Sequence, residues 1–159
     1  EPQKNPLMAV QIAHELQRAG VDFSLKMVGR GSLCEDVESE IKNCHLEDFV
    51  CVVPDADREV VASLMRESDC LIMTSHSEGS PVVVAEAGAV GLPCVVNENS
   101  DNDLWIQNGV NGFRVTENSA REFEKAIIKT LKLDKLRITQ IAESRSKKKS
   151  IPSLLSMLK

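Results

Sequence analysis

The chain has 159 residues, enough for one domain with a sizeable core. Hydrophobic residues make up 42% of it and charged residues 27%, a composition that excludes disordered and fibrous proteins. The net charge of −5 argues against the broadly basic surface of a nucleic-acid-binding domain, and no uninterrupted apolar run is long enough to span a bilayer.

The cysteines indicate a reducing compartment. They are odd in number and show no Cys-x-x-Cys spacing, and most adjoin apolar runs, so we expect reduced, buried thiols in the cytoplasm. No His or Cys pair stands at metal-ligand spacing, and no metal site is predicted. The five cysteines are Cys34, Cys44, Cys51, Cys70 and Cys94.

The first half of the chain alternates predicted helices with predicted strands. Pro6 suits the first turn of a helix, where its missing N–H costs nothing, and Ser32 with Glu35 forms a capping box that predicts another helix start. Residues 49–53 form a short apolar run, typical of a strand buried on both faces of a parallel sheet. The expected elements are a helix 6–20, a strand 23–28, a helix 33–43, a strand 49–53, a helix 58–66 and a strand 70–74.

The second half continues the alternation. Ser80 as N-cap and Pro81 at the first helical position predict a helix, and Ser119 with Glu122 predicts a further capped helix. Strands that alternate with helices predict an α/β fold with a right-handed parallel sheet. The expected elements are a helix 81–91, a strand 93–98, a helical turn 104–107, a strand 112–116, a helix 120–133 and a helical tail 134–159, which leaves one main domain, 1–133.

Ligands of an open parallel sheet bind in the loops that follow the strands, and two such loops lie in the first half. Gly29 and Gly31 would let a phosphate approach the backbone at a helix start, with Arg30 as a helper. The same spacing also serves as a plain tight turn, and the full dinucleotide fingerprint is absent. Pro54 and Asp55 form a turn that a nucleobase could lie against, although a purely structural turn is the favoured interpretation.

The third loop leads into the glycine- and valine-rich helix and combines amides with carboxylates. The N–H groups of Gly79, Ser80 and Val82 have no partner inside a helix and could bind an anion, yet Glu78 and Glu86 stand close by. A sugar nucleotide resolves the conflict, because its diphosphate binds amides while its hydroxyls donate to carboxylates. The alternatives are a helix-dipole role for Glu78 and a solvated position for Glu86, but the apolar neighbours of Glu86 leave little polar face.

The stretch SEGSPVVVAEAGAVGLPCVV resembles the signature of the C-terminal domain of retaining GT-B glycosyltransferases of family 4, including its E-x7-E spacing. Four flanking pieces fit in the same order: KNPLMAVQIAHEL, LKMVGRGSL, SDCLIMTS and NGVNGFRV. The resemblance covers about residues 4–130. It implies a Rossmann-like three-layer domain with a parallel sheet, one half of a GT-B architecture.

The resemblance also implies roles for individual residues. In that family the second glutamate of the spacing holds the ribose and the first contacts the transferred sugar, which implies these roles for Glu86 and Glu78. Lys4 matches the lysine that neutralises the diphosphate. The donor would be a UDP-, GDP- or ADP-sugar, with no metal and no further cofactor. The remaining implied donor contacts are Gly29, Arg30, Gly31, Gly79, Ser80, Pro81 and Val82.

The implied activity is transfer of a hexose or similar sugar to an acceptor hydroxyl with retention, in polysaccharide or glycolipid synthesis. The acceptor would sit mainly on an N-terminal domain outside this chain, and any membrane association would reside there. Since the opening residues 1–4 are not an initiator sequence, we expect a piece of a longer chain, with the first sheet strand upstream and no activity alone. Gly88 stands where the family usually has methionine, which predicts a looser helix.

Two alternatives remain open from the sequence. One is a nucleotide-sugar 2-epimerase of the same fold, which should carry more titratable groups that converge on the sugar. The other is a non-catalytic α/β module that keeps the nucleotide pocket or only the fold. A second α/β half upstream would favour the enzyme over the module.

Overall fold

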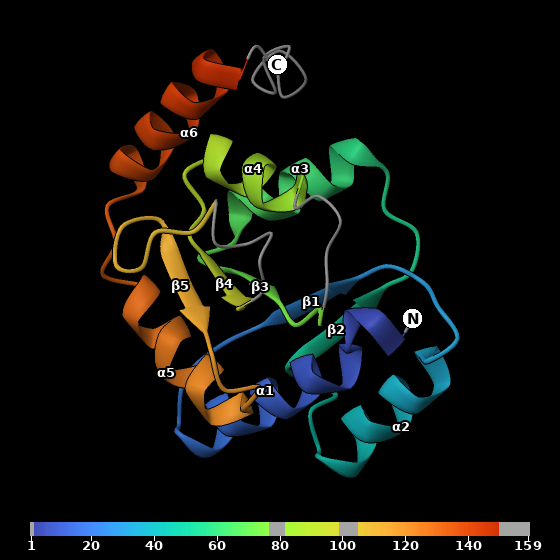
Figure 1. The fold of residues 1–159 in the computed structure, drawn as a ribbon. Helices are drawn as coiled ribbons and strands as arrows, with labels where there is room; N and C mark the ends of the chain where they lie inside the picture. The colour runs from blue at the N-terminus through green and yellow to red at the C-terminus, as the bar shows by residue number, and fades with distance from the viewer. Residues whose placement is uncertain (1, 77–81, 99–104, 150–159) are drawn as a thin grey trace.

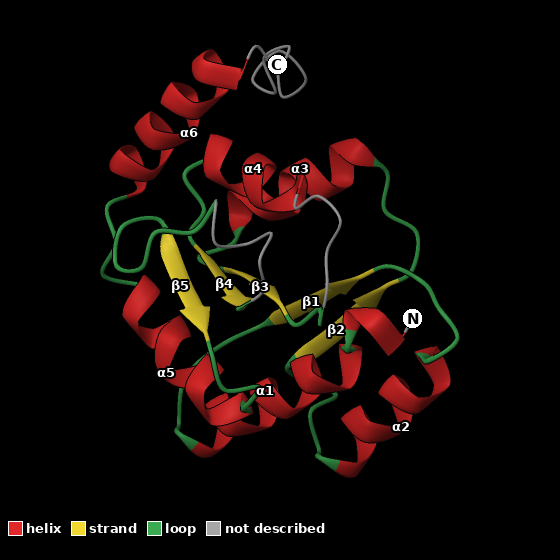
Figure 2. Cartoon of the chain, in the orientation of Figure 1, coloured by secondary structure: helices red, strands yellow, loops and turns green. Residues whose placement is uncertain are grey.

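Parallel strands form the middle layer of the fold and helices cover both of its faces (Figure 1). The structure is a computed structural model that describes residues 2–76, 82–98 and 105–149. Figure 2 shows one helix layer on each side of the strands. One layer holds α1 (Pro6–Arg18), α2 (Cys34–Asn43) and α5 (Ala120–Thr130); the other holds α3 (Arg58–Glu67) and α4 (Val82–Ala89), with α6 (Lys135–Lys149) packed on α4.

The strands of the described residues pair in parallel, as the alternating pattern predicts, but they form two sheets where one was expected. In one sheet Leu25 pairs with Val50; in the other Leu71 pairs with Cys94, which in turn pairs with Gly112. The first sheet contains β1 (Leu25–Val28) and β2 (Val50–Val53); the second contains β3 (Leu71–Met73), β4 (Cys94–Asn97) and β5 (Gly112–Val115), in that order.

The core is built around β4. All four residues of β4 are buried, and Val95 and Val96 are fully enclosed. Val95 packs with Phe123 of α5 and Ile12 of α1 on one face, while Val96 packs with Ala87 of α4 on the other. A strand with β-branched side chains on both faces therefore has a helix against each face, as expected of a central parallel strand.

The two-stranded sheet is less covered, and here one expectation is wrong. The run 49–53 was expected to be buried on both faces, yet Cys51 is exposed, and so is Val28 of β1. Among the described residues, β2 pairs only with β1 and is an edge strand, which explains the exposure. The expectation that the cysteines are buried holds for Cys94 and fails for Cys51.

The predicted capping box at the start of α2 is also wrong. The helix begins at Cys34, its N-cap is Leu33, and no side chain caps it. The amide of Cys34 bonds instead to the carbonyl of Gly31, so a turn precedes the helix and Ser32 lies inside that turn. Ser119 is the N-cap of α5 as predicted, although its hydroxyl makes no cap hydrogen bond.

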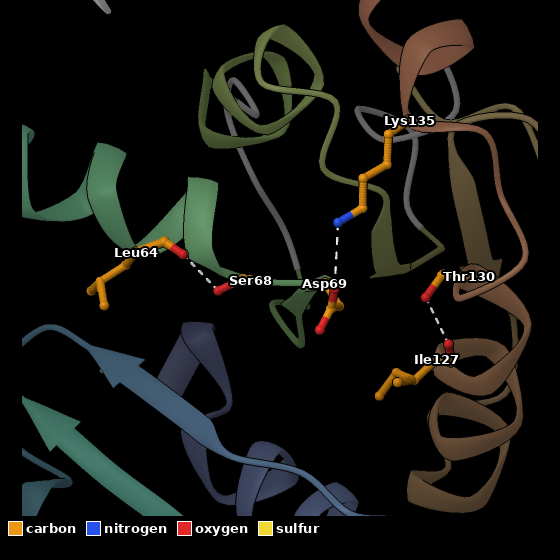
Figure 3. A network of polar contacts seen from close by, with 6 residues as sticks. All are labelled: Leu64, Ser68, Asp69, Ile127, Thr130 and Lys135. Atoms are coloured by element: carbon orange, nitrogen blue, oxygen red, sulfur yellow. Dashed lines mark hydrogen bonds and ion pairs between the residues drawn. The ribbon is translucent and has the colours of Figure 1, made fainter.

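The segment predicted as one helix over 120–133 ends at Thr130, and a second helix starts at Lys135. The carboxylate of Asp134 accepts the amides of Leu136 at 2.9 Å and Arg137 at 3.4 Å, as an N-cap residue does. The new helix is joined to the segment before β3 by an ion pair, in which Lys135 Nζ lies 3.3 Å from Asp69 Oδ1 (Figure 3).

Glycines let α6 come close to α4. A Cβ at Gly88 would lie 3.3 Å from Cβ of Ala142, and a Cβ at Gly91 would lie 2.9 Å from the carbonyl oxygen of Lys135. The space that a larger side chain would fill at Gly88 is therefore occupied by α6. The expectation of a looser helix at Gly88 stays a prediction, and the structure adds that α6 packs against α4 at this position.

Candidate functional site

The start of the chain is held against the carboxyl end of β3. The buried hydroxyl of Thr74 lies 2.9 Å from the carbonyl oxygens of both Lys4 and Asn5, and donates to them. The amide of His76 donates to the carbonyl of Gln3 at 3.0 Å. These contacts bring Lys4 next to Thr74, just beyond the end of β3, although the two residues are 70 apart in the chain.

Local sequence explains how Lys4 reaches this position. Pro2–Lys4 form a 3-10 turn, and Asn5 adopts a left-handed backbone with φ of 49° before α1 begins at Pro6. Asn accepts this conformation more readily than most residues, and Pro is favoured in a first helical turn. The chain therefore turns sharply at Asn5 and leaves Lys4 exposed at the carboxyl edge.

Glu86 lies on α4 and is partly buried. Val84 and Ala87 point into the core, whereas Val82, one turn before Glu86, is 52% exposed. Residues four apart share a helix face, so Glu86 lies on the same face of α4 as Val82. A carboxylate in this position is shielded from part of the solvent but can still be reached by a ligand.

In the turn after β1, Gly29 and Gly31 make different contacts. Gly29 has a φ of 129°, which side chains rarely allow, and its amide donates to the carbonyl of Val53 at 3.0 Å. The amide of Gly31 lies 3.3 Å from the sulfur of Cys34. Gly29 therefore serves the turn through its conformation and through strand pairing, and its N–H is already used.

The charged side chains around this turn also differ from those expected of a simple phosphate-binding turn. Arg30 forms an ion pair with Asp55, which joins the loop after β1 to the loop after β2. Both side chains are largely exposed, so the pair adds little stability. Glu35 and Asp36 occupy the first turn of α2 and already offset the positive end of its dipole. Arg30 is thus the cationic side chain of this turn, and Asp55 already offsets part of its charge.

Four predicted site residues lie outside the described residues: Glu78, Gly79, Ser80 and Pro81. Their assigned roles stay predictions. The others all follow the carboxyl ends of strands or the loop beyond. Lys4 is held at the end of β3, residues 29–31 follow β1, Val82 begins α4, and Glu86 lies in the middle of that helix.

Sequence reasoning missed a polar network before β5. The side chain of Asn111 accepts the amide of Gln107 at 2.7 Å and donates to the carbonyl of Trp105 at 2.8 Å. Arg145 of α6 donates to the same carbonyl. The repeated Asn-Gly pairs of NGVNG were a usable signal, because Asn side chains commonly bond to nearby backbone in turns. The network ties α6 to the loop before β5.

Two properties of the described residues bear on the site. These residues hold no group of three or more His, Cys, Asp or Glu side chains that could bind a metal ion. None of the helices formed by residues 2–76, 82–98 and 105–149 is long and apolar enough to cross a membrane.

Comparison with known proteins identifies a family and several relatives. The family model described as "Glycosyl transferases group 1" matches residues 1–147. The putative glycosyltransferase EpsF of Bacillus subtilis is 35% identical over 96 residues, which is 60% of this chain and 24% of that protein. The Escherichia coli UDP-Gal:alpha-D-GlcNAc-diphosphoundecaprenol alpha-1,3-galactosyltransferase is 27% identical over 131 residues, 80% of this chain and 33% of that protein.

Solved structures agree on the fold. A TarM variant of S. aureus, solved in a complex that contains UDP, superposes with a TM-score of 0.81 at 16% identity and covers 94% of this chain and 30% of its own. HepE of Anabaena with UDP-glucose has a TM-score of 0.76 at 20% identity, over 91% of this chain and 42% of its own. These likenesses confirm the predicted Rossmann-like α/β fold. The chain spans about a quarter to a third of the length of the curated relatives it matches.

Proposed function

Because the chain belongs to the glycosyl transferases group 1 family, we propose that it is the donor-binding half of a retaining GT-B glycosyltransferase of family 4. Its ligand is a nucleotide diphosphosugar, and the sugar passes to an acceptor hydroxyl in polysaccharide or glycolipid synthesis. One observation carries the proposal most directly. The hydrogen bonds from Thr74 and His76 hold residues 3–5 at the carboxyl end of β3, the strand that precedes α4 and Glu86 in the chain.

Lys4 is assigned to the diphosphate. Its ammonium group would offset the charge that grows on the leaving diphosphate, and the amides of residues 79–82 would donate hydrogen bonds to the same group. Preorganised donors aimed at developing charge are commonly the largest single contribution to catalysis. With these groups in place the leaving group would need no divalent ion.

Glu86 is assigned to the ribose. A carboxylate can accept hydrogen bonds from two neighbouring hydroxyls at once, and a charged acceptor makes each bond stronger. The partly buried position of Glu86 suits this role, because reduced solvent access strengthens an electrostatic contact. Arg30 and the glycine turn after β1 are assigned to the phosphate side of the nucleotide.

Glu78 is assigned to the transferred sugar, on the resemblance alone. The acceptor would bind to a second domain, since the chain corresponds to only part of each relative. The described chain should therefore bind the donor and catalyse nothing alone. We place the enzyme in the cytoplasm.

Uridine is the first base to test. The name of the Escherichia coli relative specifies UDP-galactose, and HepE was solved with UDP-glucose. Both relatives are similar to this chain across most of its length. GDP and ADP remain the alternatives that a binding experiment should include.

Calorimetric titration with UDP, GDP and ADP tests the proposal, with Glu86→Ala as the variant. We expect one nucleotide to bind saturably to the unmodified chain. The variant should lose at least about tenfold in affinity, because a hydrogen bond to a charged group contributes about 1.5–3 kcal/mol and 1.4 kcal/mol is a factor of ten.

Glu59→Ala is the matched control, since Glu59 is exposed in the first turn of α3 and its loss changes the net charge equally. Its affinity should equal that of the unmodified chain. Equal weakening in both variants would indicate a general charge effect and contradict the role of Glu86. Absence of binding to all three nucleotides by a folded chain would contradict the proposal that this half holds the donor.

A further inference from the structure

Three exposed apolar side chains lie within nine residues where α5 ends and α6 begins. Leu136 is 76% exposed, Leu131 60% and Ile128 36%, whereas the other large apolar side chains exposed among the described residues are three valines elsewhere in the chain. Figure 1 shows this junction at the outer edge of the molecule, on the side of the edge strand β5. Apolar groups that gather on the surface of a folded domain commonly mark a binding surface.

The exposed groups of α5 share one face of the helix. Leu131 follows Ile128 by three residues and Lys132 follows it by four, so the three side chains are neighbours on the helix surface. Lys125, three residues before Ile128, extends this face toward the start of the helix. The opposite face is the buried one, which holds Phe123, Ala126 and Thr130.

The first turn of α6 continues the exposed surface. Leu136 and Arg137 are exposed, whereas Ile138 is buried and Ala142 packs on α4 at Gly88. Only residues 131–134 connect the two helices, so the exposed end of α5 and the exposed start of α6 lie close together. The apolar groups of both helices therefore belong to one surface.

Basic side chains surround these apolar groups. Within the described part of the chain, the side chains of Lys132 and Arg137 make no ion pair. Three carboxylates stand nearby: Asp134 accepts two amides of α6, Asp69 pairs with Lys135 (Figure 3), and Glu122 interacts with Lys129. The exposed basic residues between 128 and 137 are Lys129, Lys132, Lys135 and Arg137.

The junction belongs to a basic part of an otherwise acidic chain. Residues 120–149 carry ten Lys and Arg against four Asp and Glu, a net charge of +6. Residues 1–119 carry eight against twenty, a net charge of −12. A charge asymmetry of this kind indicates an anionic partner for the basic part.

The kinds of side chain at the junction favour a lipid surface over another macromolecule. Protein interfaces are enriched in aromatic residues, methionine and arginine and depleted in lysine, whereas residues 128–137 hold three lysines and no aromatic residue or methionine. Proteins that bind single-stranded nucleic acid use aromatic rings on which the bases stack. Leucine beside lysine and arginine is typical of segments that lie in the interface of an anionic bilayer.

We propose that the junction of α5 and α6, residues 128–137, docks on the surface of a bilayer that contains anionic lipids. Leu131 and Leu136 enter the boundary between headgroups and acyl chains, and Lys132 and Arg137 bind the lipid phosphates. The acidic remainder of the chain is repelled by the same bilayer, which orients the domain. The family resemblance places any membrane contact on a domain outside this chain, and this surface adds one within it.

The docked orientation leaves the candidate nucleotide site open. Lys135 pairs with Asp69, just before β3, so the junction lies toward the amino end of the three-stranded sheet. Thr74 holds Lys4 at the other end of β3. A bilayer at the junction therefore does not cover the residues that follow the carboxyl ends of the strands. The inference does not depend on which ligand those residues bind.

Co-sedimentation of the 159-residue chain with lipid vesicles is the first test. The chain should bind vesicles of phosphatidylcholine with about 30% phosphatidylglycerol at least about tenfold more tightly than vesicles of phosphatidylcholine alone, because anionic lipid creates the potential that attracts basic residues. An increase of NaCl from about 0.05 M to about 0.5 M should weaken the binding, since salt screens this attraction.

A pair of charge reversals tests the basic residues of the junction. Lys132→Glu combined with Arg137→Glu should weaken binding to the anionic vesicles at least about thirtyfold, because each basic side chain near such a surface contributes about fivefold. The matched control is Lys42→Glu combined with Arg58→Glu, two exposed residues on α2 and α3 whose reversal changes the net charge equally. The control should lose no more than about threefold, since distant exposed charges are screened.

A neutral substitution tests the apolar residues. Leu136→Ser should weaken binding about tenfold without any change in charge, because the leucine side chain no longer enters the bilayer. Val60→Ser is the matched control, since Val60 is also an exposed apolar residue in the first turn of a helix, α3. It should bind like the unmodified chain. Both variants should keep the Tm of the unmodified chain, because both side chains are exposed.

Each other outcome would overturn the proposal. Absence of binding to the anionic vesicles would do so, and self-association that Leu136→Ser abolishes would then assign the surface to a second copy of the chain. Equal binding with and without phosphatidylglycerol would exclude the role of charge. Equal loss in Leu136→Ser and Val60→Ser, or no loss in either, would exclude insertion of the junction leucines.

Discussion

The two sheets of this molecule differ in how their strands are covered. In the three-stranded sheet, β4 is enclosed by β3, β5 and a helix on each face, and Val95 and Val96 have no solvent contact. In the two-stranded sheet, Val28 and Cys51 reach the solvent. Buried apolar surface stabilises a fold in proportion to its area, so the three-stranded sheet should contribute more stability than the two-stranded sheet.

The residues of the candidate site are divided between these two differently covered sheets. Lys4 and Glu86 are attached to the well-covered sheet, through Thr74 and α4. Arg30 is attached to the less covered sheet and is joined to Asp55 of the same sheet's second loop. Substitutions should therefore have unequal effects in the two sheets, and the following experiments test that inequality.

The largest effect is expected at Gly112, where β5 begins. A Cβ there would lie 2.0 Å from the carbonyl oxygen of Cys94, and the φ of 155° disfavours any side chain. Gly112→Ala should lose more than about 4 kcal/mol of unfolding free energy, the range of a steric conflict in a core. Urea denaturation measures this loss of unfolding free energy.

Gly109→Ala is the control, because Gly109 also has a positive φ, of 75°, but a Cβ there meets nothing within 4 Å. It should lose about 1–2 kcal/mol from backbone strain alone. Equal losses at the two glycines would show that close strand contact does not dominate the three-stranded sheet.

Truncation of one phenylalanine beside each sheet compares the stability that the two sheets contribute. Phe123 is fully buried against Val95, and Phe123→Ala should lose about 3–5 kcal/mol. Phe49, which precedes β2, is partly buried and stacks on Phe23 with ring centroids 5.3 Å apart. Phe49→Ala should lose less, about 1–2 kcal/mol, since less area leaves the core. A larger loss at Phe49 would reverse the comparison.

Stability should fall above pH 9 because of a thiol in the three-stranded sheet. Burial raises the pKa of Cys70 from 9.0 to about 11, although hydrogen bonds with Thr130 and Val95 lower it in part. The raised pKa means that the stabilising contribution is complete below pH 9 and is lost as the pH rises to about 11. The loss that comes from Cys70 at pH 10 should be roughly 1 kcal/mol relative to pH 8.

Urea denaturation of Cys70→Ala at both pH values checks this prediction, with Cys51→Ala as the control at an exposed thiol. The fall in stability should be smaller in Cys70→Ala than in Cys51→Ala. An identical fall in both variants would assign the pH dependence to other groups.

The smallest effect is expected at the ion pair between α6 and the segment before β3. Lys135 and Asp69 are 60% and 76% exposed, and exposed pairs contribute about 0.2–1 kcal/mol. Lys135→Ala should therefore change unfolding free energy by less than about 1 kcal/mol. A loss above that range would show that the ion pair, and not the close packing at Gly91, holds α6 in place.

The sequence predicted elements that depend on local patterns. The strand predicted over 93–98 and the helix start predicted at Pro6 appear in the structure as β4 and the start of α1. Features that depend on distant partners were missed. Whether the run at 49–53 is central or at an edge depends on which strands flank it, and its own residues do not contain that information.

The features of the candidate site likewise divide into those that a local pattern indicates and those that depend on distant partners. The contact between Lys4 and the end of β3 joins residues 70 apart, and the pair of Arg30 with Asp55 joins residues 25 apart. No spacing rule within one helix or strand could reveal either. The resemblance supplied the association of Lys4 with the loop before α4, whereas the neutralisation of Arg30 by Asp55 became visible only in the folded chain.

The structural role of Gly112 also affects what a sequence match to this segment can indicate. The segment NGVNGFRV contributed to the resemblance, yet Asn111 in it bonds to neighbouring backbone and Gly112 makes room for the carbonyl of Cys94. Neither role involves a ligand. A protein that had lost its chemistry but kept its shape would still retain this segment, so a match there reports ancestry and architecture, and says little about catalysis.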